Sequence, residues 1–123
     1  MKALISFAPI ALLVLVMNAN AAETASAAPS GAIDRITLIY LSHKIYPNGA
    51  VVCESKVVGI RSMVGCWNES LNGKSSPHIW LYDAGKFMSV NGSARQLAQG
   101  KFSNESDIGV VPLPLPADIN VGS

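Results

Sequence analysis

The sequence VVCESKVVGIRSMVGCW, residues 51–67, decides the fold of this chain. It contains two strand-like segments, Val51–Val58 and Ser62–Trp67. The dipeptide Gly59-Ile60 lies between them, and glycine is favoured at the first central position of a type II′ turn. The stretch therefore predicts a β-hairpin with a two-residue loop.

This hairpin register places Cys53 directly opposite Cys66. Counting outward from the turn, the two cysteines occupy a non-hydrogen-bonded pair, where the Cα atoms approach closely enough for a disulfide bond. The disulfide shares a face with Val57 and Val64, and we expect that face to point to the core. The other face carries Glu54, Lys56, Arg61 and Trp67. Because Ile60 is not a favoured turn residue, a longer loop over residues 59–62 would break the register.

The two cysteines are the only ones in the chain, and their spacing favours a structural disulfide. A loop of about 14 residues closed in this way stabilises a fold by about 3 kcal/mol. Redox-active pairs usually have C-x-x-C spacing, and a metal site needs further ligands close by. Neither pattern surrounds Cys53 or Cys66, so the sequence predicts no metal and no cofactor.

The N-terminus has the pattern of a signal peptide over residues 1–21. Lys2 precedes an apolar stretch, Ala3–Met17, and Ala19-Asn20-Ala21 fits the small-x-small cleavage site. Ala25-Ser26-Ala27 is a second possible cleavage site. The apolar stretch is shorter than the roughly twenty residues that a membrane-spanning helix needs. We therefore expect a periplasmic or secreted protein, although a eukaryotic origin remains open.

The rest of the chain predicts a mainly β domain. Residues 22–32 form an expected flexible leader, residues 33–111 the compact domain, and residues 112–123 a Pro-rich extended tail. Ile33–Leu41 is rich in β-branched residues and predicts a first strand. Further predicted elements are a hairpin of His78–Tyr82 and Lys86–Val90, a short helix near residues 94–99 after a Ser93 capping box, and an edge strand that begins at Ile108. The expected architecture is an antiparallel sheet of four to six strands with one short helix.

Charge and composition exclude several function classes. Residues 22–123 carry eight basic and eight acidic side chains. A nucleic-acid-binding protein needs a basic surface that neutralises phosphates, and capture by an anionic membrane also needs a basic patch. We therefore expect neither nucleic-acid binding nor membrane insertion after signal cleavage.

No group of residues forms a recognisable catalytic set. The chain has two histidines, His43 and His78, and no G-x-S-x-G motif. Its carboxylates form no motif, and no phosphate-binding glycine loop occurs. Three N-x-S sequons begin at Asn68, Asn91 and Asn104. They would be glycosylation candidates in a eukaryotic protein, and in a bacterial one they are turn formers and a helix cap.

Aromatic and proline residues are the best candidates for a binding surface. Tyrosine and tryptophan are favoured anchors in protein interfaces, although they also fill the cores of small domains. A stiff Pro-rich segment can dock onto a partner at low entropic cost. The candidate binding residues are Tyr40, Trp67, Trp80, Tyr82, Pro112 and Pro114.

The leading functional hypothesis is an exported binding module that acts by protein–protein contact, as an inhibitor, an immunity-like factor or an accessory factor. The first alternative is a structural or assembly component of the cell envelope, which would self-associate. The second alternative is a small hydrolase that uses His43 or His78. Sequence leaves the partner and the oligomeric state open.

Overall fold

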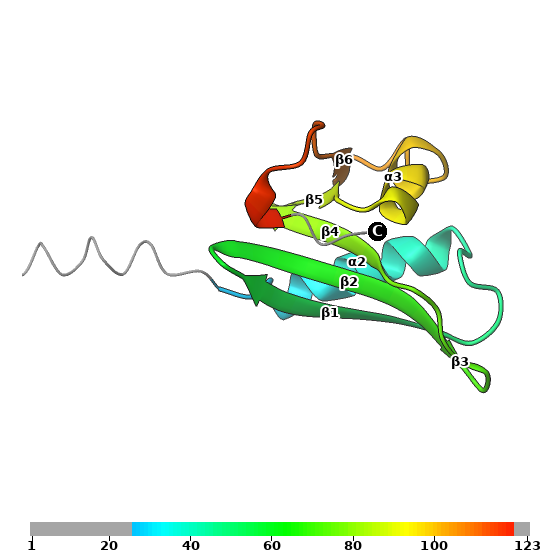
Figure 1. Ribbon diagram of the computed structural model, residues 1–123. Helices are drawn as coiled ribbons and strands as arrows, with labels where there is room; N and C mark the ends of the chain where they lie inside the picture. Colours follow the sequence, from blue (N-terminus) through cyan, green and yellow to red (C-terminus); the bar gives the residue numbers. More distant parts are fainter. Residues whose placement is uncertain (1–25, 120–123) are drawn as a thin grey trace, which may run out of the picture.

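The computed structural model describes residues 26–119, which form one mixed six-stranded sheet with two helices (Figure 1). The expected signal peptide, residues 1–21, lies outside the described residues. The elements in chain order are α2 (Ser30–Ser42), β1 (Ala50–Val58), β2 (Arg61–Ser70), β3 (Gly73–Lys74), β4 (His78–Asp83), β5 (Lys86–Ser89), α3 (Gly92–Gln99), β6 (Ile108–Val110) and the 3-10 helix η2 (Ala117–Ile119).

The disulfide-closed hairpin is confirmed. Strands β1 and β2 pair antiparallel from Ala50↔Glu69 to Val58↔Arg61, and Cys53 lies opposite Cys66 with a disulfide between them. Gly59 has a φ of +61° and is the residue of the loop with a positive φ, as a type II′ turn requires. The face that carries the disulfide points into the core, as expected.

The second hairpin is also confirmed, with a shorter loop than the sequence suggests. Strands β4 and β5 pair from Trp80↔Ser89 to Asp83↔Lys86, so Asp83 belongs to the strand rather than to the turn. The two loop residues, Ala84 and Gly85, both have positive φ angles. This combination is the geometry of a type I′ turn, which suits the twist of a tight hairpin.

The sheet order is β1-β2-β4-β5-β6, with β3 paired to β2. Strand β6 is the edge strand expected from Ile108, but it runs parallel to β5. The sheet is therefore mixed rather than purely antiparallel. Helix α3 lies between β5 and β6 in the chain and supplies the crossover connection that a parallel pair requires.

The prediction of a strand at Ile33–Leu41 is wrong, because these residues belong to helix α2. The β-branched residues favour a strand locally, but their buried positions recur at helical spacing. Ala32, Ile36 and Tyr40 are four residues apart and all face the sheet. Burial of that stripe outweighs the weak intrinsic preference of isoleucine and threonine for strands.

Helix α3 begins earlier than the predicted helix and has a different cap. Asn91 is the N-cap residue, and its side-chain oxygen accepts hydrogen bonds from Ala94 N and Ile79 N. Its amide nitrogen donates to the carbonyl of Pro77. Asn91 is 8% exposed. Through these three hydrogen bonds, this sequon residue holds the start of α3 and the start of β4 together.

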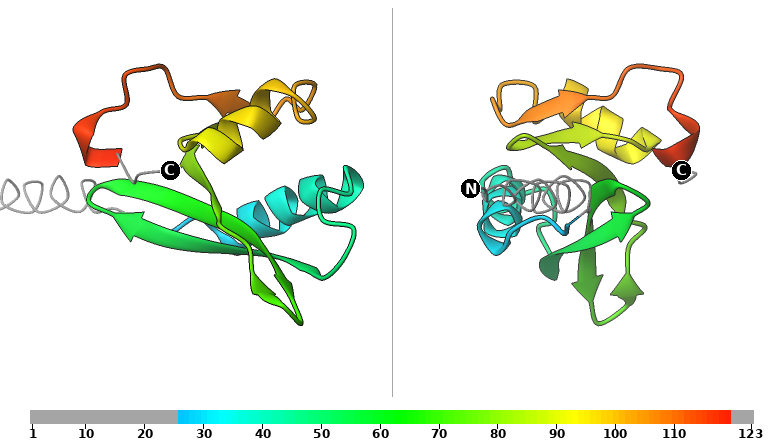
Figure 2. Two further views of the ribbon diagram at one scale, coloured as in Figure 1. Left: turned by 45° about the vertical axis from the view of Figure 1, so that its right-hand side comes forward. Right: turned by 90° about the vertical axis from the view of Figure 1, so that its left-hand side faces the viewer.

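Two apolar clusters lie on opposite faces of the sheet. Helices α2 and α3 cover the first face, where Val64, Cys66, Trp80 and Phe87 are buried (Figure 2). The opposite face carries Met63, Leu81 and Val90, which pack with Val111 and Ile119 from the C-terminal segment. Residues 26–32, expected in a flexible leader, include Ala28 and Ala32 of the first cluster.

Candidate functional site

The six candidate binding residues do not form one surface. Tyr40 and Trp80 are both fully buried in the first apolar cluster, which corrects their assignment to a contact surface. Residues on α2 and β4 face the same layer of the core, so these two rings meet each other instead of solvent. Trp67 and Tyr82 are half-buried on different faces of the sheet, and Pro112 and Pro114 are exposed on the C-terminal segment.

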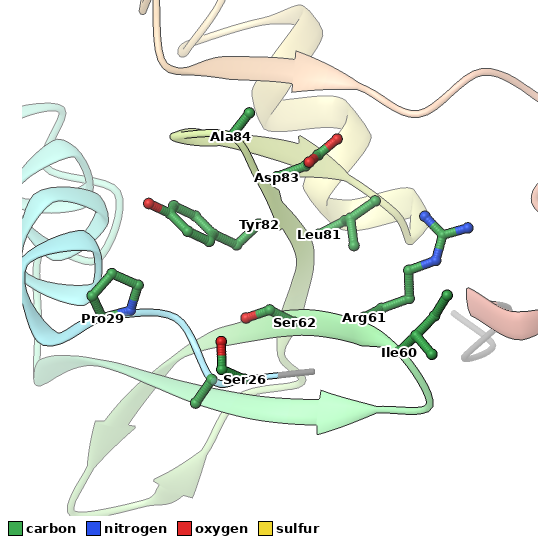
Figure 3. Close-up of a pocket in the computed structure, with 10 residues that line it drawn as sticks. Ser26, Pro29, Ile60, Arg61, Ser62, Leu81, Tyr82, Asp83 and Ala84 are labelled. Carbon is green, nitrogen blue, oxygen red and sulfur yellow. The ribbon is translucent and has the colours of Figure 1, made fainter. Parts of the chain in front are cut away.

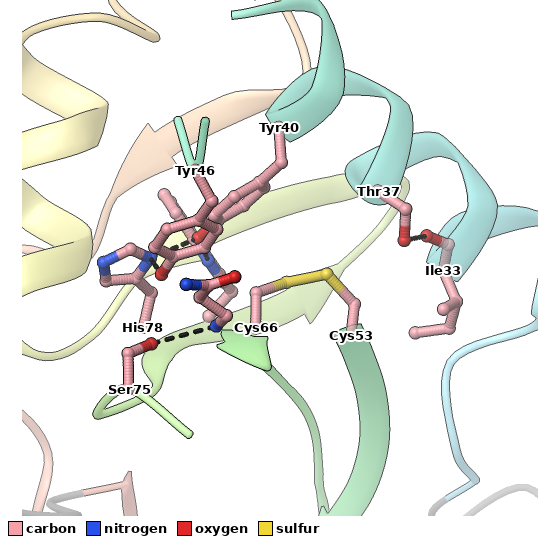
Figure 4. The surroundings of a disulfide bond; sticks show 10 residues. Ile33, Thr37, Tyr40, Tyr46, Cys53, Cys66, Ser75 and His78 are labelled. Carbon is pink, nitrogen blue, oxygen red and sulfur yellow. Dashed lines mark hydrogen bonds between the residues drawn. A yellow bond between two sulfur atoms is a disulfide. The ribbon is translucent and has the colours of Figure 1, made fainter. Parts of the chain in front are cut away.

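Tyr40 and Trp80 belong to a hydrogen-bonded chain that ends at His78, beside the disulfide (Figure 4). Trp80 Nε1 donates to Tyr40 Oη over 3.0 Å, and Tyr40 Oη lies 2.7 Å from His78 Nδ1. An indole N–H can only donate, so the Tyr40 hydroxyl hydrogen is free to be donated to His78. His78 Nδ1 is then an acceptor, which makes the ring neutral with its proton on Nε2.

Burial favours the neutral forms of these groups. It raises the pKa of Tyr40 well above the ordinary value for tyrosine and also raises the pKa of Tyr46, whose ring stacks on His78. Burial lowers the pKa of His78. At neutral pH both tyrosines are therefore protonated and His78 is uncharged. The hydrogen bonds of the cluster satisfy polar groups inside the core. Among these residues there is no serine or free cysteine paired with the histidine as a nucleophile.

The other histidine lies at the end of α2 and contacts the loop that follows α3. His43 Nε2 is 2.7 Å from Glu105 Oε2, and the His43 ring lies edge-on to Phe102. Nearby, Arg35 bonds to Asp107 and to the carbonyl of Gly85. These contacts attach α2 to the β5–β6 side of the molecule, which is a structural role.

Tyr82 lines an open groove of about 590 Å³ between the N-terminal segment and the sheet (Figure 3). The hydroxyl groups of Ser26 and Ser62 and the side chains of Arg61 and Asp83 lie around it. Neither histidine lines this groove, so its serines have no neighbouring imidazole base.

A largely apolar hollow of about 370 Å³ lies on the sheet face opposite the helices. Its centre is Gly65, which stands opposite Glu54 of β1 and Ile79 of β4. A glycine in the middle of a strand leaves a gap that the neighbouring side chains surround. The lining residues are Glu54, Ser55, Lys56, Val58, Met63, Val64, Gly65, Trp67, Pro77 and Ile79.

Trp67 stands at the wall of this hollow and is held by its neighbours. Its Nε1 donates to Glu69 Oε2 over 2.9 Å, and Lys74 Nζ lies 5.2 Å from the ring centroid. Lys74 also approaches Glu69. These contacts fix the orientation of a large, partly exposed aromatic ring, which lowers the entropy that the ring loses on binding.

The C-terminal segment packs against the same sheet face as this hollow. Ile119 is 1% exposed within the second apolar cluster, and Arg61 forms an ion pair with Asp118 over 2.9 Å. Pro112 and Pro114 face solvent between these anchors and Val111. The segment therefore covers one part of the sheet face and leaves the Gly65 hollow beside it open.

Residues 26–119 contain no candidate metal site and no helix that could cross a membrane. In this part of the chain, the histidine, cysteine and acidic side chains form no group of three that could hold a metal ion. None of its helices has the length and apolar character needed to cross a membrane.

Comparisons with protein-family models, with curated protein sequences and with solved structures found no match to this chain.

Proposed function

We propose that this chain is an exported binding module that acts by protein–protein contact in the periplasm or outside the cell. The observation that carries this proposal is the apolar hollow at Gly65, beside the partly exposed Trp67. Binding sites are concave, mainly apolar and equipped with a few polar groups that orient the ligand. The Gly65 hollow has these properties, with Glu54 and Lys56 as the charged groups at its edge.

Export is supported by the disulfide and by the N-terminal sequence. The Cys53–Cys66 bond indicates an oxidising compartment, which fits an extracellular or periplasmic location. The pattern of residues 1–21 indicates export by a signal peptide, since it combines a basic residue, an apolar stretch and a small-x-small cleavage site.

The occupant that fits the hollow is an apolar side chain from an extended segment of a partner protein. The volume is large enough to admit a leucine or an aromatic side chain, and Trp67 offers one rigid wall for it. A carboxylate and an ammonium group at the rim favour a segment with polar groups on either side of its apolar anchor. This mode of contact suits an inhibitor, an immunity-like factor or an accessory factor.

Filling the hollow tests this proposal. A Cβ at Gly65 would lie at ordinary contact distances, 3.7 Å from Ile79 Cδ1 and 3.8 Å from the Trp67 ring, so Gly65→Val should fold. The matched control is Gly31→Val, at an exposed position of α2 with open space around it. Each oxidised protein is used to capture partners from envelope and culture-fluid extracts, and captured proteins are identified by mass spectrometry.

The proposal predicts one stoichiometric partner that the natural protein and Gly31→Val retain and Gly65→Val loses. The purified partner should then bind the natural protein directly, with an affinity at least tenfold higher than for Gly65→Val. A partner that Gly65→Val still binds equally well would remove the contact site from this hollow. Failure of the folded natural protein to retain any partner would contradict the binding function.

A further inference from the structure

Strand β1 lies at an edge of the sheet and spans nine residues. Val58 and Arg61 close a two-residue loop, so they form a hydrogen-bonded pair, and the bonded pairs alternate from there along β1. The backbone groups of Val51, Cys53, Ser55 and Val57 consequently point away from β2. Within residues 26–119, no backbone or side-chain group forms a hydrogen bond with these outward-pointing backbone groups.

Helix α2 packs on the covered face of β1, and within residues 26–119 it forms no backbone hydrogen bond with the outer edge of that strand. From there its side chains reach across the sheet, because Tyr40 contacts Trp80 of β4 and Arg35 bonds to Asp107 and the Gly85 carbonyl beyond β4. Near β1 the N-terminal segment forms one bond, from Ala28 N to the side-chain oxygen of Ser55 on the helix-covered face. The outer backbone of β1 is thus left available for another strand.

We propose that β1 pairs antiparallel with β1 of a second copy of this chain, with Ser55 at the two-fold axis. In this arrangement Glu54 of each copy lies opposite Lys56 of the second copy. Both side chains are exposed, and neither forms an ion pair within the described part of the chain. The strand is therefore self-complementary in charge, as an interface with two-fold symmetry requires.

The alternation of backbone groups is compatible with this register, and charge excludes its neighbours. Ser55 must face an outward-pointing residue, and with Ser55 opposite itself, Cys53 faces Val57 of the second copy, whose backbone also points outward. About six backbone hydrogen bonds then join the two strands. A shift by two residues in either direction would place Glu54 opposite Glu54, or Lys56 opposite Lys56, and like charges opposite each other are destabilising.

Pairing also covers apolar side chains on both faces. Val57, which is 42% exposed, would lie opposite Cys53 of the second copy. On the other face, Val52 would lie opposite Val58, and both are partly exposed in the single chain. Long exposed edges rich in valine tend to pair with other chains, and the dimer satisfies this tendency in one defined register.

This inference goes beyond the proposed function and does not depend on it. The Gly65 hollow shares the side chains of Glu54 and Lys56 with this interface, but it lies on the second sheet face, between β1 and β4, and does not use the outer backbone of β1. Gly65→Val should therefore abolish partner capture without changing the dimer. A failure of either proposal is thereby distinguishable from a failure of the other.

The test is a charge exchange measured by sedimentation equilibrium of the oxidised protein. Glu54→Lys and Lys56→Glu each convert two attractive contacts across the axis into two repulsive ones, and should weaken the dimer by about tenfold or more. The double variant with both substitutions restores opposite charges and should dimerise within a few-fold of the natural protein. Circular dichroism spectra should match throughout, because both residues are exposed, and thermal unfolding should match at concentrations low enough for every protein to be monomeric.

A mixing experiment tests the register itself. A Glu54→Lys chain presents two basic residues and a Lys56→Glu chain two acidic ones, so each alone should dimerise at least about tenfold more weakly than the natural protein. An equimolar mixture should form a heterodimer, because every contact across the axis then joins opposite charges. A natural protein that stays monomeric at the highest soluble concentration would overturn the proposal. So would a mixture or a double variant that does not regain dimerisation.

Discussion

Tyr40 Oη accepts a hydrogen bond from Trp80 Nε1 at 3.0 Å, and both side chains are completely buried. This bond joins helix α2 to strand β4 through the largest side chains of the core. It explains how a polar indole N–H and a phenol are accommodated where no solvent reaches them. Because Tyr40 also donates to His78, removal of a single oxygen atom affects three residues.

Tyr40→Phe should lower the free energy of unfolding by about 1–3 kcal/mol, because the buried Trp80 N–H loses its acceptor. Urea unfolding followed by tryptophan fluorescence measures this difference. The control is Tyr46→Phe, since the Tyr46 hydroxyl lies 3.4 Å from His78 Nδ1 and Tyr46 is only half-buried. Equal losses of unfolding free energy in the two variants would show that the Tyr40–Trp80 bond adds no more stability than the Tyr46–His78 contact.

The stability of the domain should decrease as the pH falls below the ordinary pKa of histidine, about 6.5. Burial lowers the pKa of His78 in the folded state, so the unfolded state binds a proton at a higher pH than the folded state does. The free energy of unfolding therefore falls between the unfolded and the folded pKa and levels off below the folded one.

His78→Gln removes this titration and leaves the carboxylates unchanged. Urea unfolding at about pH 7.5 and about pH 5.5 should show a smaller loss of stability in the variant than in the natural protein. The reverse order, with a larger loss in the variant, would contradict the neutral state assigned to His78.

The double variant Cys53→Ala/Cys66→Ala should unfold with a free energy lower by about 3 kcal/mol, since the disulfide closes a loop with a sequence separation of 13. The hairpin register should persist, because the turn at Gly59 and the β2–β4 pairing also specify it. Equilibrium unfolding in urea gives the energy, and the reduced natural protein is the control. If the variant and the reduced protein differ in stability by more than about 1 kcal/mol, the substitutions themselves disturb the core.

The disulfide-closed hairpin could be predicted because its signals are local. Gly59 defines the turn, and the positions of Cys53 and Cys66 then allow one register. Helix α2 could not be predicted from the composition of Ile33–Leu41, since β-branched residues occur in both types of element. The spacing of Ala32, Ile36 and Tyr40 was the available signal, and it points to a helix.

Other features depend on contacts between distant parts of the chain. The parallel pairing of β5 with β6 follows from where α3 returns the chain, which no local pattern specifies. The burial of Trp80 likewise depends on α2 lying above it. The hollow at Gly65 had one local signal, an isolated glycine inside a strand pattern, which indicates a close approach or a gap.

The C-terminal segment should be essential for stability. A truncated protein that no longer binds a partner could therefore have lost its fold rather than a contact surface. Ile119 is buried against Met63 and Leu81, so Ile119→Ala should lower the free energy of unfolding by about 2–4 kcal/mol. Leu113→Ala is the matched control, because Leu113 is 70% exposed on the same segment and should change stability by less than about 0.5 kcal/mol.

Urea unfolding of both variants checks this difference. Removal of the chain after Val111 would delete Ile119 and break the Arg61–Asp118 ion pair, so a loss of partner binding would then reflect unfolding. The same holds for Trp80→Ala, which should cost about 3–5 kcal/mol. Comparable stability of Ile119→Ala and Leu113→Ala would mean that the segment does not pack on the sheet in solution. Because the Gly65 hollow shares Met63 with the cluster that contains Ile119, its shape would then also differ.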